Sequence, residues 1–137
     1  MSLILDASIT FAWFHEDERT PAVVSVLDRV VESGAIVPSI WKLEVANGFQ
    51  TAIRRGRIDP AFRDSALEKL TNLAIELDSE TLAQAWSTTP RIADRHTLTI
   101  YDATYLELAE RRRLPLATLD RALCHAATAS GVETLGL

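Results

Sequence analysis

The sequence predicts an α/β protein in which helices flank a mainly parallel sheet. Short apolar runs with the character of buried strands alternate along the chain with longer segments whose apolar residues recur at helical spacing. Prolines and glycines stand at several junctions, as Pro21 and Gly34 do. The length of 137 residues suits one domain, so we expect a single domain over residues 1–137.

The first half of the chain begins with a strand that leads directly into a helix. Pro21 suits the first turn of a second helix, which Gly34 ends, and Ser39 can cap a third. Asp59 and Pro60 open a fourth helix. We therefore expect strands at residues 2–6 and 35–37, and helices at residues 7–14, 21–34, 40–55 and 60–74.

The second half repeats the alternation. A short strand is expected at residues 75–78. Ser79 caps a segment that Pro90 interrupts, so two short helices are expected between Glu80 and Arg95. The remaining expected elements are a helix at residues 100–112, a strand at 116–118, a helix at 120–130 and a last strand around 133–135.

The composition is that of an ordinary globular protein, with 47% apolar and 24% charged residues. The net charge of -5 argues against a broad basic surface for nucleic acid, so a polyanionic substrate would need bound cations or local basic patches. No apolar run approaches the roughly 18 residues of a membrane helix, and we expect a cytoplasmic protein without membrane contact. Cys124 stands alone, which excludes an internal disulfide and makes a poor zinc site.

Acidic residues stand where carboxylates can serve a metal ion. Asp6 ends the first apolar run and Asp120 ends another, so both would lie at the edge formed by the carboxyl ends of parallel strands. Asp102 shares a helix face with apolar residues, among them Tyr105 and Leu106. An isolated buried charge costs several kcal/mol, so a carboxylate there must be paired, protonated or bound to a cation.

Glu44 is the fourth candidate. It lies at the border of the apolar stripe of its helix, beside Trp41. Gly48 follows one turn later, and its missing side chain is expected to leave space near the carboxylate. Hydroxyl groups accompany the other candidates, because Ser8 stands two residues after Asp6 and Thr118 two residues before Asp120.

Each carboxylate also has a simpler explanation. Asp6 and Asp120 each precede a helix, where an Asp side chain favourably accepts a backbone N–H of the first turn. Asp102 in a first helical turn complements the helix dipole, and Glu44 alone would be a solvated surface charge. One metal site accounts for all four residues, whereas the simpler account needs a separate reason for each. The metal site is therefore the preferred hypothesis.

The chain resembles the PIN-domain ribonucleases of the VapC toxin type. The resemblance covers essentially the full length in order and spacing, with Glu44 in its helix and a Thr118-Leu119-Asp120 triplet near the end. Its most specific parts are the opening Leu5-Asp6-Ala7-Ser8 and the segment Tyr101-Asp102-Ala103-Thr104-Tyr105-Leu106-Glu107-Leu108-Ala109; Trp13-Phe14-His15-Glu16 also matches.

This resemblance implies a three-layer α/β/α sandwich whose acidic pocket binds Mg²⁺ or Mn²⁺ and hydrolyses RNA. Asp6, Glu44, Asp102 and Asp120 match the acidic quartet of the family, and the Thr118 and Ser8 hydroxyls match supporting positions. It also implies a homodimer silenced by a cognate antitoxin, whose C-terminal segment occupies a groove beside the active site. The chemistry is consistent, because Mg²⁺ takes oxygen ligands and can activate water and neutralise a phosphate.

Other residues of chemical interest have ordinary explanations. Arginines form three clusters, at Arg54, Arg55 and Arg57, at Arg91 and Arg95, and at Arg111, Arg112 and Arg113. Such clusters are mostly solvated helix ends that complement the helix dipole, and contact with RNA is the alternative. The three His residues (His15, His96 and His125) are expected in packing or surface roles, and the three Trp residues (Trp13, Trp41 and Trp86) in the core or an interface.

Two other functions remain open from the sequence. In a haloacid-dehalogenase-like phosphatase Asp6 would accept a phosphoryl group, but such sites want a second Asp two residues on, where this chain has Ser8. A non-catalytic scaffold whose acidic pocket docks a basic partner segment is the other alternative.

Overall fold

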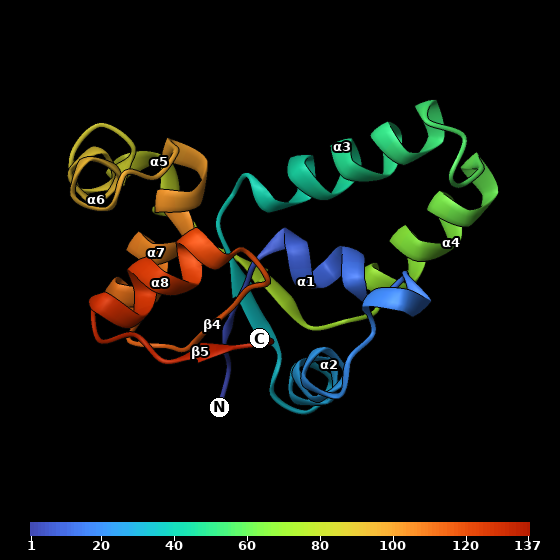
Figure 1. Ribbon diagram of the computed structural model, residues 1–137, viewed down its shortest axis with the longest axis horizontal. Helices are drawn as coiled ribbons and strands as arrows, with labels where there is room; N and C mark the ends of the chain where they lie inside the picture. Colours follow the sequence, from blue (N-terminus) through green and yellow to red (C-terminus); the bar gives the residue numbers. More distant parts are fainter.

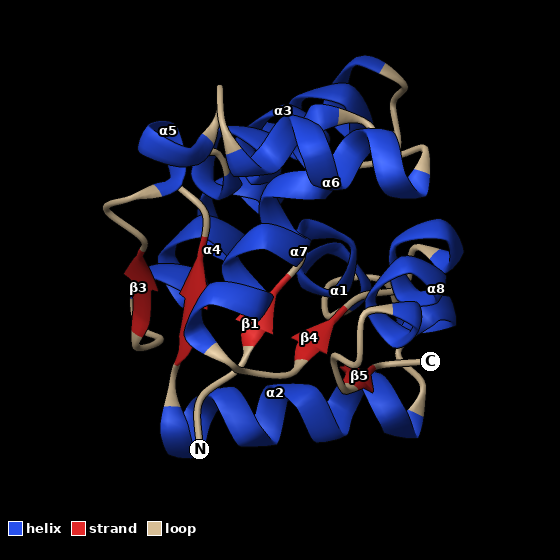
Figure 2. Cartoon of the chain, turned by 90° about the vertical axis from the view of Figure 1, so that its left-hand side faces the viewer, coloured by secondary structure: helices blue, strands red, loops and turns tan.

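The computed structural model describes residues 1–137 and contains a five-stranded sheet. The strands have the order β3-β2-β1-β4-β5, and all neighbours are parallel. Figure 2 shows the strands side by side, and the arrowheads of β1, β3 and β4 point the same way. Their bounds are β1 Ile4–Leu5, β2 Ala35–Val37, β3 Ile75–Leu77, β4 Leu116–Ala117 and β5 Thr134–Leu135.

Helices cover both faces of this sheet. In Figure 1, α1 to α4 lie on one side of the strands and α5 to α8 on the other. The helices are α1 Ala7–Ala12, α2 Pro21–Ser33, α3 Trp41–Arg54, α4 Pro60–Thr71, α5 Thr81–Gln84, α6 Thr88–His96, α7 Ile100–Arg112 and α8 Arg121–Ala129, with a 3₁₀ turn, η1, at Glu16–Glu18. The predicted three-layer α/β/α sandwich is confirmed.

Local chemistry explains where the elements begin and end. Ile4 and Leu5 are completely buried, as expected for a strand covered on both faces. The Thr20 hydroxyl accepts a hydrogen bond from the Val23 N–H at 3.2 Å and so caps α2. Gly34 ends that helix with a φ of 75°, and a Cβ there would lie 2.7 Å from the carbonyl oxygen of Ala74.

Three predicted features are wrong in detail. Ser39 does not cap α3; its backbone N–H donates to the Thr81 hydroxyl at 3.1 Å, and Ile40 precedes the helix without a side-chain cap. Ser79 does not cap α5 either, because Glu80 precedes that helix. Pro90 does not interrupt a helix but lies in the first turn of α6, where the N–H that proline lacks would have no intrahelical partner.

No helix is both long and apolar enough to span a membrane.

Candidate functional site

Asp6 lies between β1 and α1 and is 7% exposed. Its Oδ2 atom accepts hydrogen bonds from the Ser8 hydroxyl at 2.6 Å and the Thr118 hydroxyl at 2.8 Å. The side chain makes no capping hydrogen bond to α1, so the capping explanation is wrong for this residue. Two hydroxyl groups from different parts of the chain instead hold the carboxylate in one orientation.

The same hydroxyls tie Asp6 to the connection between β4 and α8. The Ser8 oxygen accepts the Leu119 N–H at 2.9 Å, and the Thr118 oxygen accepts the Asp120 N–H at 3.0 Å. Asp120 does cap α8, because its Oδ1 accepts the Leu123 N–H at 2.8 Å. Its Oδ2 makes no hydrogen bond to the protein, so one oxygen serves the helix and the other remains available.

Tyr105 positions Glu44. The Tyr105 side chain is completely buried within α7, and its hydroxyl donates a hydrogen bond to Oε1 of Glu44 on α3. Burial and the negative charges of Asp6 and Glu44 raise the pKa of the Tyr105 hydroxyl, so it stays a donor. The sequence placed Tyr105 only on a buried face; the signal for its role is that a buried tyrosine hydroxyl normally needs a polar partner.

Gly48 does not leave space beside Glu44. A Cβ atom at Gly48 would lie 2.0 Å from the ring of Phe11, so the ring occupies the space that the glycine provides. Phe11 in turn packs edge-to-face on Phe49 with ring centroids 5.6 Å apart. The expected opening is therefore part of the packing between α1 and α3.

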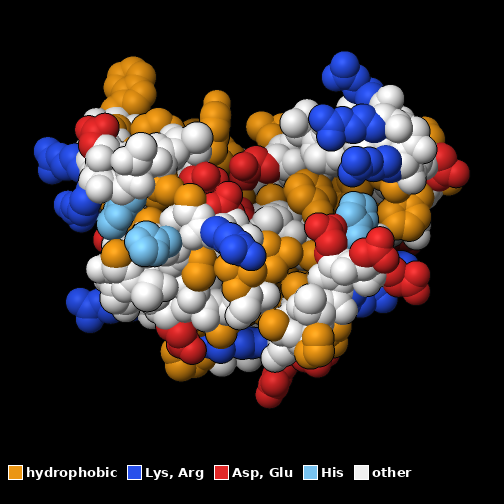
Figure 3. Space-filling model, viewed as in Figure 1, with side chains coloured by type: hydrophobic (Ala, Val, Ile, Leu, Met, Phe, Trp, Pro, Cys, Tyr) orange, Lys and Arg blue, Asp and Glu red, His pale blue; other side chains and the backbone are white.

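The four candidate carboxylates converge at the carboxyl edge of the sheet. Burial raises the pKa of the Asp6 carboxyl, and the charge of Asp120 raises it further. Burial and the charges of Asp6 and Asp102 raise the pKa of Glu44. Burial and the charges of Asp120 and Asp6 likewise raise the pKa of Asp102. Figure 3 shows acidic side chains gathered in a notch between the α5–α8 side and the α3–α4 side of the molecule.

The donor set of this notch suits a hard divalent cation. All its donors are oxygens, and none of the four carboxylates forms a salt bridge with Lys, Arg or His, so its negative charge has no protein counter-ion. No three His, Cys, Asp or Glu side chains are grouped so that they could hold a metal ion as they stand. The arrangement fits an ion such as Mg²⁺, which is usually bound by one or two carboxylates and keeps several waters.

A second buried acidic cluster is neutralised by the chain itself. Asp78 follows β3, is 5% exposed and accepts two hydrogen bonds from the Arg111 guanidinium, at 3.0 and 2.7 Å. Arg111 also pairs with Glu107 at 2.7 Å and with Glu80 at 3.2 Å. Arg111 is therefore occupied by ion pairs and does not form the solvated helix end or RNA contact considered from the sequence.

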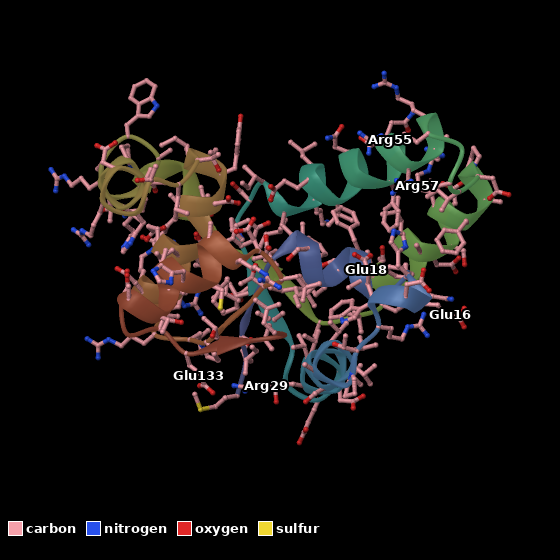
Figure 4. The ribbon with its side chains drawn as sticks, viewed as in Figure 1. Glu16, Glu18, Arg29, Arg55, Arg57 and Glu133 are labelled. Atoms are coloured by element: carbon pink, nitrogen blue, oxygen red, sulfur yellow. The ribbon has the colours of Figure 1, made fainter.

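The other basic residues are dispersed. The Arg112 side chain lies 3.7 Å from Glu76, and both are exposed. Arg55 and Arg57 lie at the end of α3 and in the α3–α4 turn, far along the helix from Glu44 (Figure 4). Arg54, Arg55 and Arg57 form no salt bridge. Trp13 and Trp41 are buried, whereas Trp86 is 98% exposed and does not belong to the core.

Comparisons with known proteins agree with this architecture. The PIN domain family model matches residues 3–129. Ribonuclease VapC3 of Pyrobaculum aerophilum is 30% identical over 123 residues, covering 90% of this chain and 92% of that protein. Ribonuclease VapC3 of Mycobacterium tuberculosis is 34% identical over 104 residues, covering 74% and 72%.

Two solved structures share the fold. PAE2754 from Pyrobaculum aerophilum superposes with a TM-score of 0.71 at 24% identity, over 98% of this chain and 89% of that chain. FitAcB from Neisseria gonorrhoeae gives a TM-score of 0.67 at 18% identity, over 98% and 96%. The match of the family model over most of the chain, together with the similarity to the VapC3 ribonucleases, shows that this chain belongs to the PIN-domain family.

Proposed function

We propose that this protein is a metal-dependent endoribonuclease, the toxin of a toxin–antitoxin pair. The observation that carries the proposal is the convergence of four carboxylates, without a counter-ion, in a notch at the carboxyl edge of the sheet. The similarity to proteins named Ribonuclease VapC3 supports RNA as the substrate.

In this proposal Asp6, Glu44, Asp102 and Asp120 would hold Mg²⁺, directly or through the waters that this ion keeps, and Mn²⁺ would substitute for it. The bound ion supplies an activated water and neutralises charge on the scissile phosphate. Ser8 and Thr118 keep Asp6 oriented, each through a hydrogen bond to Oδ2. Tyr105 does the same for Glu44. These outer hydrogen bonds fix the direction of the ligand oxygens, so they matter for ion affinity as well as for geometry.

The test is cleavage of single-stranded and structured RNA by purified protein in EDTA, Mg²⁺ and Mn²⁺. We expect cleavage only with a divalent cation and fragments with 5′-phosphate and 3′-hydroxyl ends. Asp6→Asn protein prepared in parallel controls for a contaminating nuclease. Cleavage that persists in EDTA, or in the Asp6→Asn protein, would contradict the assignment.

The toxin role predicts an antitoxin and a homodimer. An apolar cavity of about 340 Å³ between α3 and α4 is lined by Trp41, Val45, Leu67, Leu70 and Leu73, among others, and could receive an antitoxin segment. The Trp41 indole N–H has no hydrogen-bond partner in the protein. Expression of the chain alone should arrest growth, and sequencing of the 5′ ends of the accumulating RNA fragments should identify the target. Harmless expression of an active nuclease would leave the ribonuclease role intact and remove the toxin role.

A scaffold role is the second candidate, because no three acidic side chains are grouped to hold an ion as they stand. A scaffold would bind a basic peptide in the notch and would not cleave RNA with Mg²⁺ or Mn²⁺. The cleavage assay therefore separates the two candidates.

A further inference from the structure

Tyr101 occupies an unusual place beside the acidic notch. It is the second residue of α7, stands directly before Asp102, and is 63% exposed. Its hydroxyl forms no hydrogen bond within the protein, unlike that of Tyr105. Most large apolar side chains of α7, including Tyr105, Leu106 and Leu108, are completely buried. Tyr101 is therefore an aromatic side chain left in solvent at the site.

Helix geometry places the Tyr101 side chain on the side of α7 that faces α3. Successive residues turn by about 100°, so Tyr101 lies about 40° to one side of Tyr105 and Asp102 about 60° to the other. Tyr105 points to α3, because its hydroxyl bonds to Glu44. Side chains of a helix tilt toward its N-terminus, and the N-terminus of α7 carries Asp102. The Tyr101 ring thus lies one turn nearer the N-terminus of α7 than Tyr105, at the rim of the notch. Figure 3 shows hydrophobic side chains beside the acidic ones in this region.

The negative charge of the protein favours a contact with RNA that does not depend on the phosphates, and an exposed aromatic ring can provide such a contact. The chain has a net charge of -5 and the notch presents carboxylates, so the local field opposes the binding of RNA phosphates there. Arg121, exposed and directly after Asp120, supplies one positive charge next to these carboxylates. Arg54 ends α3, and Arg55 and Arg57 follow it, so this arginine cluster lies at the far end of the helix from Glu44. A base is uncharged and has a π-face, so it can stack on an exposed aromatic ring whatever the sign of the local field.

We propose that Tyr101 stacks on the base of a nucleotide next to the cleaved phosphate. This inference rests on the proposed ribonuclease function and assigns to it a substrate-positioning residue.

The first test is a double-mutant cycle in which the Tyr101 ring and the RNA base are removed separately and together. The substrates are a single-stranded RNA with a mapped cleavage site and copies with one abasic nucleotide at each position flanking that site. Loss of the ring in Tyr101→Ala should raise KM about tenfold with little change in kcat, which is the size expected for one base–aromatic stack. Tyr101→Phe keeps the ring and should cleave like wild type. On the abasic copy at the stacking position, wild type and Tyr101→Ala should have the same KM.

Ile100→Ala is the matched control. Ile100 is 43% exposed in the same turn of α7, and it points about 200° around the helix from Asp102. The Ile100→Ala substitution removes exposed apolar surface from a side chain that does not face the notch, so the KM of this variant should equal that of wild type. An equal rise of KM in Ile100→Ala and Tyr101→Ala, or a Tyr101→Ala effect that is the same on every abasic copy, would overturn the stacking role.

The second test measures binding without cleavage. An RNA with 2-aminopurine in place of the stacking base is titrated with Asp6→Asn protein, and the fluorescence should be quenched on binding, because stacking quenches this base. Quenching should disappear when Tyr101→Ala is added to the Asp6→Asn background, and it should remain with Tyr101→Phe. Sedimentation of the Tyr101→Ala protein should match wild type; a change in its oligomeric state would assign the ring to a contact between copies instead.

The two hypotheses fail in different ways. Wild-type protein that cleaves no RNA with Mg²⁺ or Mn²⁺ contradicts the proposed function, whatever the fluorescence shows. Wild-type cleavage with an unchanged KM in Tyr101→Ala contradicts the stacking role alone.

Discussion

Two buried carboxylates follow strands of the same sheet, but only one of them has a cationic partner in the protein. Asp6 comes directly after β1 and Asp78 directly after β3, and their residues are 7% and 5% exposed. Each accepts a threonine hydroxyl at 2.8 Å, from Thr118 and Thr81 respectively. Asp78 is paired with Arg111, whereas Asp6 has no cationic partner in the protein. The difference therefore lies in the counter-ion.

The two environments shift the pKa values in opposite directions. Burial raises the pKa of Asp6, and its hydroxyl hydrogen bonds do not overcome this effect. Burial also acts to raise the pKa of Asp78, but hydrogen bonds from Arg111 and Thr81 and the charge of Arg111 outweigh it, so that pKa is lowered. A carboxylate neutralised from within stabilises the fold, and one left without a counter-ion provides a place for an external cation.

The largest expected effect is the loss of activity when the charge of Asp6 is removed, compared with removal of the charge of Asp78. Asp6→Asn should lower kcat/KM for RNA at least about 1,000-fold, or about 4 kcal/mol, because it removes a proposed metal ligand. Asp78→Asn should leave kcat/KM within a few-fold of wild type and lower stability instead. Cleavage assays beside circular dichroism of both variants check this, and a folded Asp6→Asn protein of normal activity would sink the assignment of Asp6.

Removing the internal cation should produce the largest loss of stability. Arg111→Met leaves Asp78 and Glu107 buried without a counter-ion and should lower the free energy of unfolding by about 3–5 kcal/mol. Arg112→Met is the control, because the exposed pair of Arg112 with Glu76 contributes less than about 1 kcal/mol. Urea unfolding of both variants measures the difference. Similar losses in the two would show that the Arg111 cluster is not a structural ion pair.

The sequence was sufficient for the pattern of elements and for choosing four carboxylates that the fold brings together, whose role as metal ligands stays a prediction. The limits predicted for the helix at residues 100–112 and the strand at 35–37 are those observed, because the periodicity of apolar residues and adjacent turn residues mark them locally. The placement of Asp6 and Asp120 at one sheet edge follows from parallel strand geometry.

What the sequence could not supply were partners that are distant along the chain. Asp78 was expected at the end of a strand, but nothing local indicates that Arg111, 33 residues away, neutralises it. The bond from Tyr105 to Glu44 spans 61 residues, and the ring that fills the space at Gly48 comes from another helix. Such contacts depend on how elements pack, and the local pattern of a segment carries no record of that packing.

A smaller effect is expected from the threonines that each cluster uses. Thr118→Val removes the hydroxyl that donates to Asp6 and accepts from the Asp120 N–H, and it should lower kcat/KM about 10- to 100-fold, the range for losing an outer partner of a metal ligand. Thr81→Val makes the equivalent change at Asp78 and should leave kcat/KM unchanged while costing about 1–3 kcal/mol of stability. Equal activities of the two variants would contradict the distinction between the clusters.

The smallest expected effect is a difference in the pH dependence of stability of the metal-free protein. Both the Asp102 and Asp78 carboxyls have an ordinary pKa of 3.8, which folding raises for Asp102 and lowers for Asp78. Above pH 3.8 the unfolded chain releases the Asp102 proton while the folded protein retains it up to the raised pKa. The unfolded state then binds fewer protons, so this residue makes stability fall as pH rises through that window. Asp78 makes its contribution in full above pH 3.8 and loses it only as pH falls through the lowered pKa.

Substitution by Asn removes the titration of Asp102 or of Asp78, and therefore separates their opposite contributions to the pH dependence of stability. In EDTA, as pH rises from about 4 to 7, Asp102→Asn should gain stability relative to wild type and then level off once Asp102 is ionised in the folded wild type. Over the same range the deficit of Asp78→Asn should stay constant, because Asp78 is already ionised in both states. Urea unfolding at pH intervals measures both differences. A difference between wild type and Asp102→Asn that is flat across this range would mean that the carboxylates of the notch do not repel one another, and the reason for expecting a cation there would be lost. Addition of Mn²⁺ at pH 7 gives the complementary check, because an ion that binds the folded notch should stabilise wild type more than Asp102→Asn and should stabilise Asp78→Asn as much as wild type.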